Sequence, residues 1–295
     1  MAKTRELRRR IRSIRKTRQI TKTMEMVSTS KLKRSADRVY SARPYAEQLG
    51  AVIGRLVDPE LQERYPLLRH PEKVRRAAVI VLTSNRGLAG AFNVNLIREA
   101  RTLIDRLRRD GVTVELHAIG RKGIAFFRFR REELASTSTE VGDRVTMDDA
   151  AALIEPLRAR FEAGEVDEVY VVYAQFRSAL STPPATLRLM PVRPGSGNGG
   201  SEAEREGARV ANYIISPSTD EILNRLLPLY VRNAMYRAVV ETIAAEHGAR
   251  RTAMKNATDN AGDILDTLSR TYNRARQAQI TQEIAEIVGG AAALE

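Results

Sequence analysis

The sequence feature that most constrains the fold is an apolar repeat near the C-terminus. Its members alternate in steps of three and four residues: Met254, Ala257, Ala261, Ile264, Leu268, Thr271, Ala275 and Ala278. This spacing is typical of a helix that packs along one seam against another helix in a left-handed coiled coil. Because several of the positions are alanine, we expect the partner helix to approach closely.

Beyond Ala278 the apolar residues change sides. At 100° per residue, Ile280, Ile284, Ile287 and Val288 fall on the face opposite the alanine seam. This helix therefore needs two partners, a coiled-coil mate along the seam and a different surface that encloses its tip.

The N-terminus supplies the expected mate. Residues 4–57 read as one long helix, which Pro44 should kink. Its stripe again follows steps of three and four: Leu7, Ile11, Ile14, Thr17, Thr21, Met24, Ser28, Leu32, Ser35 and Val39. The second helix should run over residues 220–288. We predict an antiparallel pair in which the tip of the second helix projects past the start of the first.

The sequence between the helices has an α/β pattern. A continuous apolar run at 77–83 is typical of a strand covered on both faces, and a helical pattern and a second strand follow it. The predicted strands are 77–83, 112–119, 168–176, 186–192 and 209–215, and the predicted helices are 94–109, 122–129 and 148–162. Asp148 and Asp149 suit an acidic first helical turn. Residues 137–140 give no clear pattern.

The predicted fold class is therefore α+β or α/β, a long antiparallel coiled coil of the terminal helices with a Rossmann-like α/β domain inserted between them. Pro59, Pro66 and Pro71 mark the linker into the inserted domain, and a stretch at 191–207 has the Gly, Ser and charge content of a mobile loop. The predicted domains are 1–58, 74–216 and 217–295.

Composition excludes several kinds of chemistry. The chain has no cysteine, so disulfides, thiol catalysis and zinc thiolate sites are excluded. Its three histidines are far apart in sequence, and no Ser-His-Asp or paired-carboxylate arrangement stands out. No apolar run approaches the ~20 residues that span a bilayer, and the first residues lack the apolar core of a signal peptide. We predict no catalytic residue, no metal and no cofactor.

The charge lies mainly in one segment. The net charge is +13, and residues 1–38 hold 14 Lys and Arg against three acidic residues. This basic arm suits an acidic partner, which could be nucleic acid, anionic lipid or a carboxylate-rich protein. Residues 1–39 contain no aromatic side chain for base stacking. A rod-shaped protein partner explains both the charge and the apolar stripe, with nucleic-acid binding as the alternative.

A third alternative, a nucleotide-dependent enzyme, rests on Gly87-Leu-Ala-Gly90 after the first strand. This segment lacks the G-x-G-x-x-G order, and no G-K-[ST] follows it. A tight turn that needs two glycines is the favoured interpretation.

Segments in three regions of the sequence carry a family resemblance. They are IRSIRKTRQITKTMEMVSTSKLKR near the N-terminus, SNRGLAGAFN at 84–93, and ATDNAGDIL with YNRARQAQITQEIAEIVGGA near the C-terminus. Together they resemble the gamma subunit of the F-type ATP synthase, the central shaft of that rotary machine. The resemblance implies that the terminal helices form a shaft inside a ring of alternating alpha and beta subunits. It places the α/β domain against the epsilon subunit and the membrane c-ring.

The same resemblance implies a function without catalysis by this chain. ATP chemistry would belong to the beta subunits, whose carboxylate-rich loops would face the basic arm. The chain would turn with the c-ring, and its asymmetric profile would set each beta site in turn to a different conformation, so that it regulates ATPase activity and proton flow. No nucleic acid and no membrane insertion are expected. The absence of a chloroplast insert and of a transit peptide favours the cytoplasmic face of a bacterial cell membrane.

The sequence departs from the family pattern at two places. The family usually has Cys at the position of Ala89, a change that is harmless to the fold because a buried Cys behaves as a small apolar residue. It commonly has Glu-Pro where this chain has Ser216-Pro217, which alters the polar contacts expected with the c-ring.

The sharpest site expectation concerns Arg276, Gln277 and Thr281, which lie with Ile280 on the side away from the alanine seam. In the family the matching positions of ARQ-x-IT hydrogen-bond a loop of one beta subunit and hold the shaft at one orientation. We call these three residues the catch. Arg276 would supply a charge-assisted bond and the other two would supply neutral ones. The alternative is a solvated outer face.

Overall fold

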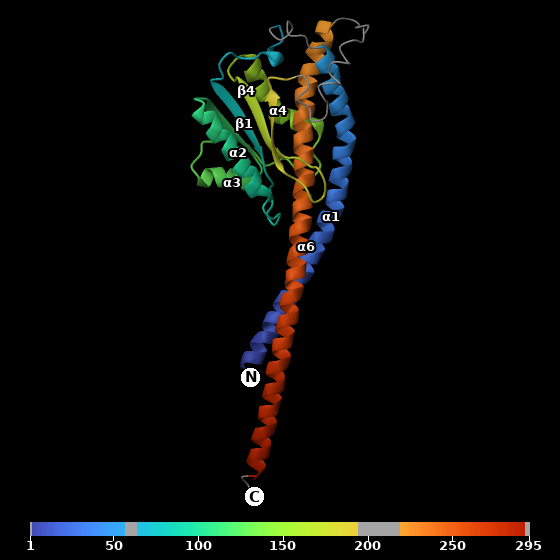
Figure 1. Cartoon of the computed structure of the whole chain (residues 1–295), viewed down its shortest axis with the longest axis vertical. Coiled ribbons are helices and arrows are strands. Elements are labelled where there is room, and N and C mark those ends of the chain that lie inside the picture. Colours follow the sequence, from blue (N-terminus) through green and yellow to red (C-terminus); the bar gives the residue numbers. More distant parts are fainter. Residues whose placement is uncertain (1, 57–63, 194–218, 293–295) are drawn as a thin grey trace. The chain divides into compact units, whose positions relative to one another are not determined.

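The structure is a computed structural model that describes residues 2–56, 64–193 and 219–292 (Figure 1). Its two long helices are α1 (Ala2–Leu56) and α6 (Thr219–Ala292). Packing divides the chain into two compact units. The first contains Met1–Thr29 and Arg250–Glu295, and the second contains Ser30–Ala249. Each long helix therefore contributes one part to each unit.

The second unit contains a five-stranded sheet. Its strands are β1 (Arg76–Leu82), β2 (Thr113–Ile119), β3 (Ser136–Ser138), β4 (Glu168–Ala174) and β5 (Pro184–Met190). They are ordered β3-β2-β1-β4-β5; the first four are parallel, and β5 is antiparallel to β4. The predicted Rossmann-like α/β domain is confirmed. The predicted strand at 209–215 lies outside the described residues.

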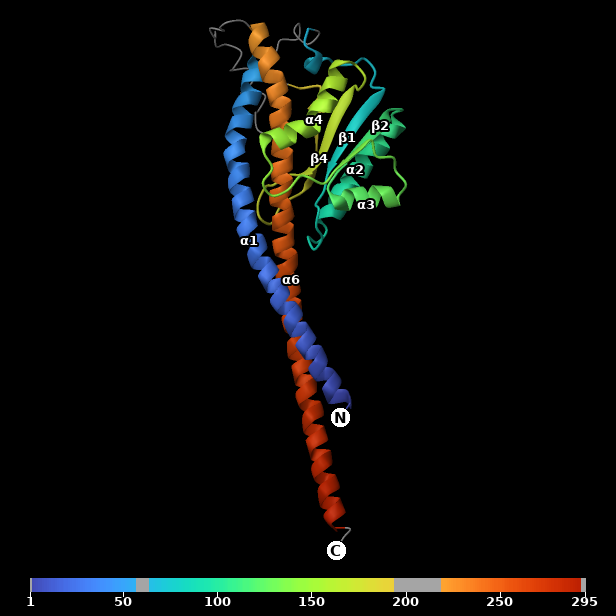
Figure 2. The ribbon, with the colours of Figure 1, turned by 180° about the vertical axis from the view of Figure 1, so that it is seen from behind.

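Helices cover both faces of this sheet, as the continuous apolar run at 77–83 predicts. The helices α2 (Phe92–Arg109) and α3 (Arg121–Phe129) lie on one face, and α4 (Met147–Glu162) and α6 lie on the other (Figure 2). Side chains of β1 point alternately into the two layers: Ala77, Val79 and Val81 into the α2 layer, and Ala78, Ile80 and Leu82 into the opposite one.

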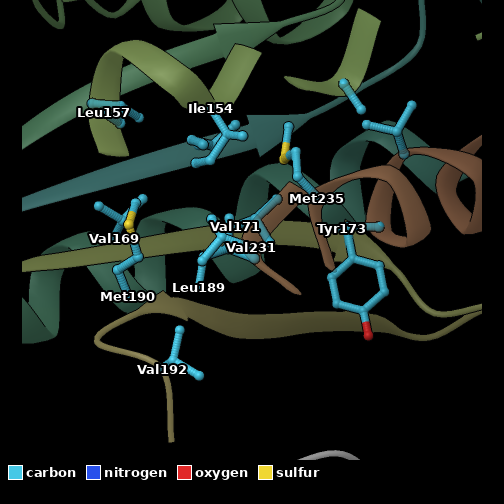
Figure 3. Close-up of a cluster of buried hydrophobic side chains, with 14 of the residues drawn as sticks. Ile154, Leu157, Val169, Val171, Tyr173, Leu189, Met190, Val192, Val231 and Met235 are labelled. Atoms are coloured by element: carbon cyan, nitrogen blue, oxygen red, sulfur yellow. The ribbon is translucent and has the colours of Figure 1, made fainter. Parts of the chain in front are cut away.

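Figure 3 shows part of the core on the α4 face of the sheet. Val169 and Val171 of β4 and Leu189 of β5 lie beside Val231 and Met235 of α6, with α4 across from them. Residues 30–56 of α1 add further apolar side chains to the same cluster: Leu32, Val39, Leu49 and Ile53. These parts of the two long helices are thus core elements of the sheet domain.

Packing and sequence divide the chain at different places. The predicted ends at 58, 216 and 217 lie outside the described residues, so those boundaries stay predictions. The packing division falls within the two helices because apolar side chains of residues 30–56 and 219–249 belong to the core of the sheet domain, whereas the parts of both helices in the first unit pack on each other.

A local capping signal fixes the start of α4, whereas Pro44 does not end α1. Thr146 caps α4: its hydroxyl accepts from the Asp149 amide at 3.2 Å, and its own amide donates to the Asp149 carboxylate at 2.8 Å. The acidic first turn predicted for this helix is confirmed. Pro44 lies inside α1 without ending it.

Candidate interaction surface on the two long helices

Within the first unit, α1 and α6 form an antiparallel pair. The Thr4 hydroxyl donates to Gln279 Oε1 at 3.0 Å, and the Thr258 hydroxyl donates to Thr21 Oγ1 at 2.8 Å. The start of α1 therefore lies beside the late part of α6, and later residues of α1 pair with earlier residues of α6. The predicted antiparallel arrangement is confirmed for this unit.

The seam of α6 differs in part from the predicted one. Its buried members are Met254, Thr258, Ala261 and Leu265, and its half-buried members are Leu268, Tyr272, Ala275 and Gln279, still in steps of four and three. Ile264 is 47% exposed, whereas Leu265 is 8% exposed. The placement of Ile264, Thr271 and Ala278 in the seam was wrong, and Ala257 is only half-buried.

The physical reason for this error is polar pairing across the seam. Both candidate stripes share Met254, Ala261, Leu268 and Ala275, and they differ by one residue in between. Apolar character favours the stripe with Ala257 and Ala278 over the one with Thr258 and Gln279. In the structure both polar side chains are satisfied by hydrogen bonds to α1, so burying them carries little penalty.

The facing stripe of α1 follows the predicted steps except at Thr17, which is exposed. Leu7, Ile11, Ile14 and Met24 are half-buried, and Thr21 is buried. Outside this stripe the basic residues are exposed, and the pairs Arg10–Glu6 and Lys22–Glu25 join neighbours on the same helix. Such exposed pairs contribute little free energy, so the arm presents its positive charge to solvent.

The end of α6 has an uncovered apolar face. Ile280 is 46% exposed, Ile284 56%, Ile287 72% and Val288 62%. Since Gln279 already pairs with Thr4, near the start of α1, the helix continues past its mate (Figure 1). A run of exposed branched side chains on one face is the pattern of an interaction site.

The three catch residues lie beside this face and are exposed. The Thr281 hydroxyl donates to the Gln277 carbonyl at 3.0 Å, a bond within its own helix. Within the part of the chain that the structure describes, Arg276 forms no ion pair. The catch side chains are therefore open to a partner that supplies acceptors.

The segment Gly87–Gly90 after β1 forms a turn. Leu88 and Gly90 adopt positive φ angles of 62° and 57°. The Ser84 amide donates to Asn93 Oδ1 at 3.0 Å, and Asn85 donates to the Thr139 carbonyl at 2.9 Å. The segment is thus a turn held by hydrogen bonds to Asn93 and to the loop that follows β3. Ala89, where the family usually has Cys, is buried as expected for a small apolar residue.

Helix α6 lies at the place where open α/β sheets usually bind ligands. That place is the crevice beyond the carboxyl ends of the strands where the strand order reverses, here between β1 and β4. The Ala174 amide donates to Thr242 Oγ1 at 3.2 Å, and the Phe176 amide donates to Glu241 Oε2 at 3.0 Å. Ala245 belongs to the apolar cluster of the α2 layer. Side chains of α6 therefore bind backbone amides at the β4 side of this crevice.

The histidines have separate structural partners. His117 Nδ1 lies 2.7 Å from Ser136 Oγ, and burial lowers the pKa of His117. His247 Nε2 lies 2.9 Å from Asp143 Oδ1, and His70 Nδ1 lies 2.8 Å from the Leu68 carbonyl. Among the described residues no cluster of His, Cys, Asp and Glu could hold a metal ion. Nor does any described helix have the length and apolar character needed to span a membrane.

The comparisons with known proteins agree along the whole chain. The family model described as ATP synthase matches residues 3–294. The chain belongs to the gamma-chain family of ATP synthases. The ATP synthase gamma chain of Gemmatimonas aurantiaca is 57% identical over 295 residues and covers all of both chains. That of Pelotomaculum thermopropionicum is 44% identical over 298 residues, again over the full length of both. Gamma chains are non-catalytic subunits, and catalysis belongs to the beta subunits.

Solved structures share the fold. A chain of the Euglena gracilis mitochondrial ATP synthase, solved as OSCP/F1/c-ring, aligns with a TM-score of 0.65 at 20% identity and covers 99% of this chain and 95% of that one. A chain of the Tetrahymena thermophila central stalk and c-ring aligns with a TM-score of 0.61 at 24% identity, over 81% of this gamma chain and 99% of its own length. The combination of helical termini and a central, mostly parallel sheet is thus the gamma-chain fold.

Sequence reasoning missed the side chains that attach the helices to the sheet domain, above all Glu241 and Asp143. A signal for Glu241 was present, because it interrupts the apolar run Ala238-Val-Val-Glu-Thr-Ile-Ala-Ala245. A carboxylate inside such a run is rarely buried unless it is paired. For Asp143, in a polar loop, the sequence offered no signal.

Proposed function

We propose that this gamma chain is the torque-transmitting, non-catalytic rotor subunit of a proton-translocating F-type ATP synthase. The observation that carries the proposal is the uncovered apolar end of α6 on a chain that matches gamma chains over its full length. An apolar helix end that the described residues of its own chain leave exposed suits an enclosing surface supplied by a partner. A ring of alternating alpha and beta subunits supplies that surface.

The partners follow from the two ends of the rotor. The alpha and beta subunits would enclose the two-helix unit, and the epsilon subunit and c-ring would bind the sheet domain. The Euglena and Tetrahymena neighbours, described as F1 with c-ring and as central stalk with c-ring, support this assignment. As the asymmetric helix pair turns, it would contact the three beta subunits differently and favour a different conformation in each.

Charge complementarity supports the ring assignment. Residues 1–38 hold 14 Lys and Arg against three acidic residues, and the basic side chains within residues 5–22 are exposed. Carboxylate-rich loops of the beta subunits would face this arm. At the end of α6, Arg276, Gln277 and Thr281 would hydrogen-bond one such loop and form the catch.

We place this complex at the cytoplasmic face of a bacterial cell membrane, with the gamma chain as a peripheral component. The relatives with the identities given above are bacterial chains. Binding to the membrane would run through the c-ring, without insertion of this chain.

Co-purification tests the function. The tagged chain, expressed with the other subunits, should be recovered with three copies each of the two larger subunits, and alone it should not hydrolyse ATP. Recovery with nucleic acid that is released by moderate salt would contradict the proposal and favour the nucleic-acid alternative.

A further inference from the structure

The connection between the sheet domain and α6 contains a fully buried carboxylate. Glu241 is 0% exposed, and its Oε1 accepts from Arg237 Nε at 3.0 Å. Arg43 of α1 lies 4.0 Å from the same carboxylate oxygen. The second oxygen accepts from the Phe176 amide at 3.0 Å. One side chain thus joins α6, α1 and the segment that follows β4.

The end of β4 is held from both helices. The Phe176 amide donates to Glu241 of α6, while the Phe176 carbonyl accepts from Arg43 of α1 at 2.5 Å. Two residues earlier, the Ala174 amide donates to Thr242 at 3.2 Å. The ring of Phe176 also packs edge-on against Tyr40. Every group in this set lies within the second unit.

These contacts are directional, unlike the apolar core around them. Apolar packing resists separation of two surfaces, but it has no preferred direction and resists sliding less well. Hydrogen bonds lose strength when distance or angle changes, so they fix the rotation of α6 against the sheet. Burying a carboxylate is costly, and an apolar residue of similar size would often serve stability as well. Stability alone therefore does not explain Glu241.

We propose that Glu241 is a positioning residue for torque transfer, which fixes the carboxyl end of β4 on α6 so that the sheet domain and the helices turn together under load. The inference rests on the proposed rotor function. Load is the condition that matters, because without it the apolar core alone keeps the elements together.

The experiment compares Glu241→Gln with the wild type in the complete complex, assembled in vesicles. Glutamine keeps the volume but removes the charge that Arg237 and Arg43 require. ATP hydrolysis and ATP-driven proton uptake are measured together while an opposing proton gradient builds up. We expect unchanged hydrolysis without a gradient and a severalfold loss of protons moved per ATP once the gradient opposes rotation.

Two further variants keep the inference falsifiable. Thr242→Val has nearly the same shape and removes the acceptor of the Ala174 amide, together with a hydrogen bond to the Ala238 carbonyl within α6. It should cause a smaller coupling loss and decides the matter if Glu241→Gln does not assemble. Glu162→Gln, which breaks the exposed pair with Arg158 on α4, is the matched control and should couple normally.

The possible outcomes distinguish failure of the Glu241 inference from failure of the proposed rotor function. If the wild-type complex moves no protons, the rotor function itself fails. If the wild type moves protons and the Glu241 and Thr242 variants match it at every gradient, the inference is overturned. A loss of hydrolysis and proton uptake in equal proportion at all gradients would also overturn it, because that pattern indicates a role in folding alone.

Discussion

Asp143 attaches a polar loop of the sheet domain to both long helices. Its carboxylate accepts from Lys31 of α1 at 2.6 Å and lies 2.9 Å from His247 of α6, and its carbonyl accepts from Arg38 at 2.5 Å. Burial raises the pKa of Asp143, but Lys31 and His247 together outweigh burial, so the pKa lies below its ordinary value of 3.8. The ionised form is therefore favoured by folding.

We expect Asp143→Asn to lower the free energy of unfolding by about 1 kcal/mol at neutral pH, a modest figure because the side chain is half exposed. A depressed folded pKa stabilises the protein above the unfolded pKa and loses this effect as pH falls through the folded pKa. The difference between variant and wild type should therefore shrink below pH 3.8. Urea unfolding at pH 7 and at decreasing pH measures it, with exposed Asp259→Asn as control. A difference that does not change with pH would contradict the assignment.

Gly120 has a positive φ of 95°, and a Cβ there would lie 2.1 Å from the Thr83 carbonyl oxygen. We expect Gly120→Ala to destabilise the sheet domain by about 3 kcal/mol or more, because backbone atoms would have to move. Gly142→Ala is the matched control, since the nearest atom to its Cβ would be 3.9 Å away. Equal melting temperatures for the two variants would show that this description of the turn is wrong.

At the scale of elements, the apolar runs predicted most of the sheet. β1, β2 and β4 were found within two residues of their ends because most of each strand is buried and contains a run rich in apolar residues. β3 was not predicted, since Ser136–Ser138 has no apolar pattern and is placed by pairing with β2 and by the contact between Ser136 and His117. Tertiary contacts, which the local sequence does not encode, decide such a strand.

The seam shows the same limit within a helix. Its steps of three and four were evident in the sequence, but the choice between two stripes one residue apart depended on partners in α1. Thr258 and Gln279 are seam residues only because Thr21 and Thr4 lie opposite them. The catch and the tip are a different case, because we propose that other chains supply their partners. The apolar pattern predicted a second surface for the tip, whereas the role of the catch came from the resemblance.

The corrected seam makes a direct prediction for neighbouring residues. Leu265→Ala should cost about 2 kcal/mol, because a buried side chain is truncated. Ile264→Ala should cost about 0.5 kcal/mol or less, because half of that side chain is already in water. Amide hydrogen exchange over residues 254–272 measures the local stability of the two-helix unit. The reverse order of effects would restore the stripe that includes Ile264.

At the scale of the whole molecule, the catch makes a prediction about assembly. In the complete complex, Arg276→Ala should cost about 1.5–3 kcal/mol at a contact made during part of the cycle, and so lower ATP turnover or weaken assembly. The isolated variant should fold as the wild type does, since the three catch residues are exposed. Unchanged assembly, turnover and proton pumping in a triple alanine variant at 276, 277 and 281 would rule the catch out.

The basic arm makes a second prediction about assembly. Because its charges are exposed, association with the alpha and beta subunits should slow as salt rises, the screening length falling from about 10 Å at 0.1 M to about 3 Å at 1 M. Replacing Arg8 and Arg12 by Gln should reduce this salt dependence, whereas Arg101→Gln on α2 should leave it unchanged. Stopped-flow mixing at several salt concentrations measures the rates. An identical salt dependence for all three proteins would show that the arm does not steer assembly.

The position of α6 at the carboxyl ends of β1 and β4 makes the helix a tethered ligand of its own sheet. A dissolved molecule competing for that crevice would face an occupant that is covalently attached, and therefore present at a very high effective concentration. The amides at the end of β4 thus keep their partners for as long as the domain is folded. A small molecule would have to displace the helix to reach them, so a fold associated with exchanging ligands here holds one of its own segments.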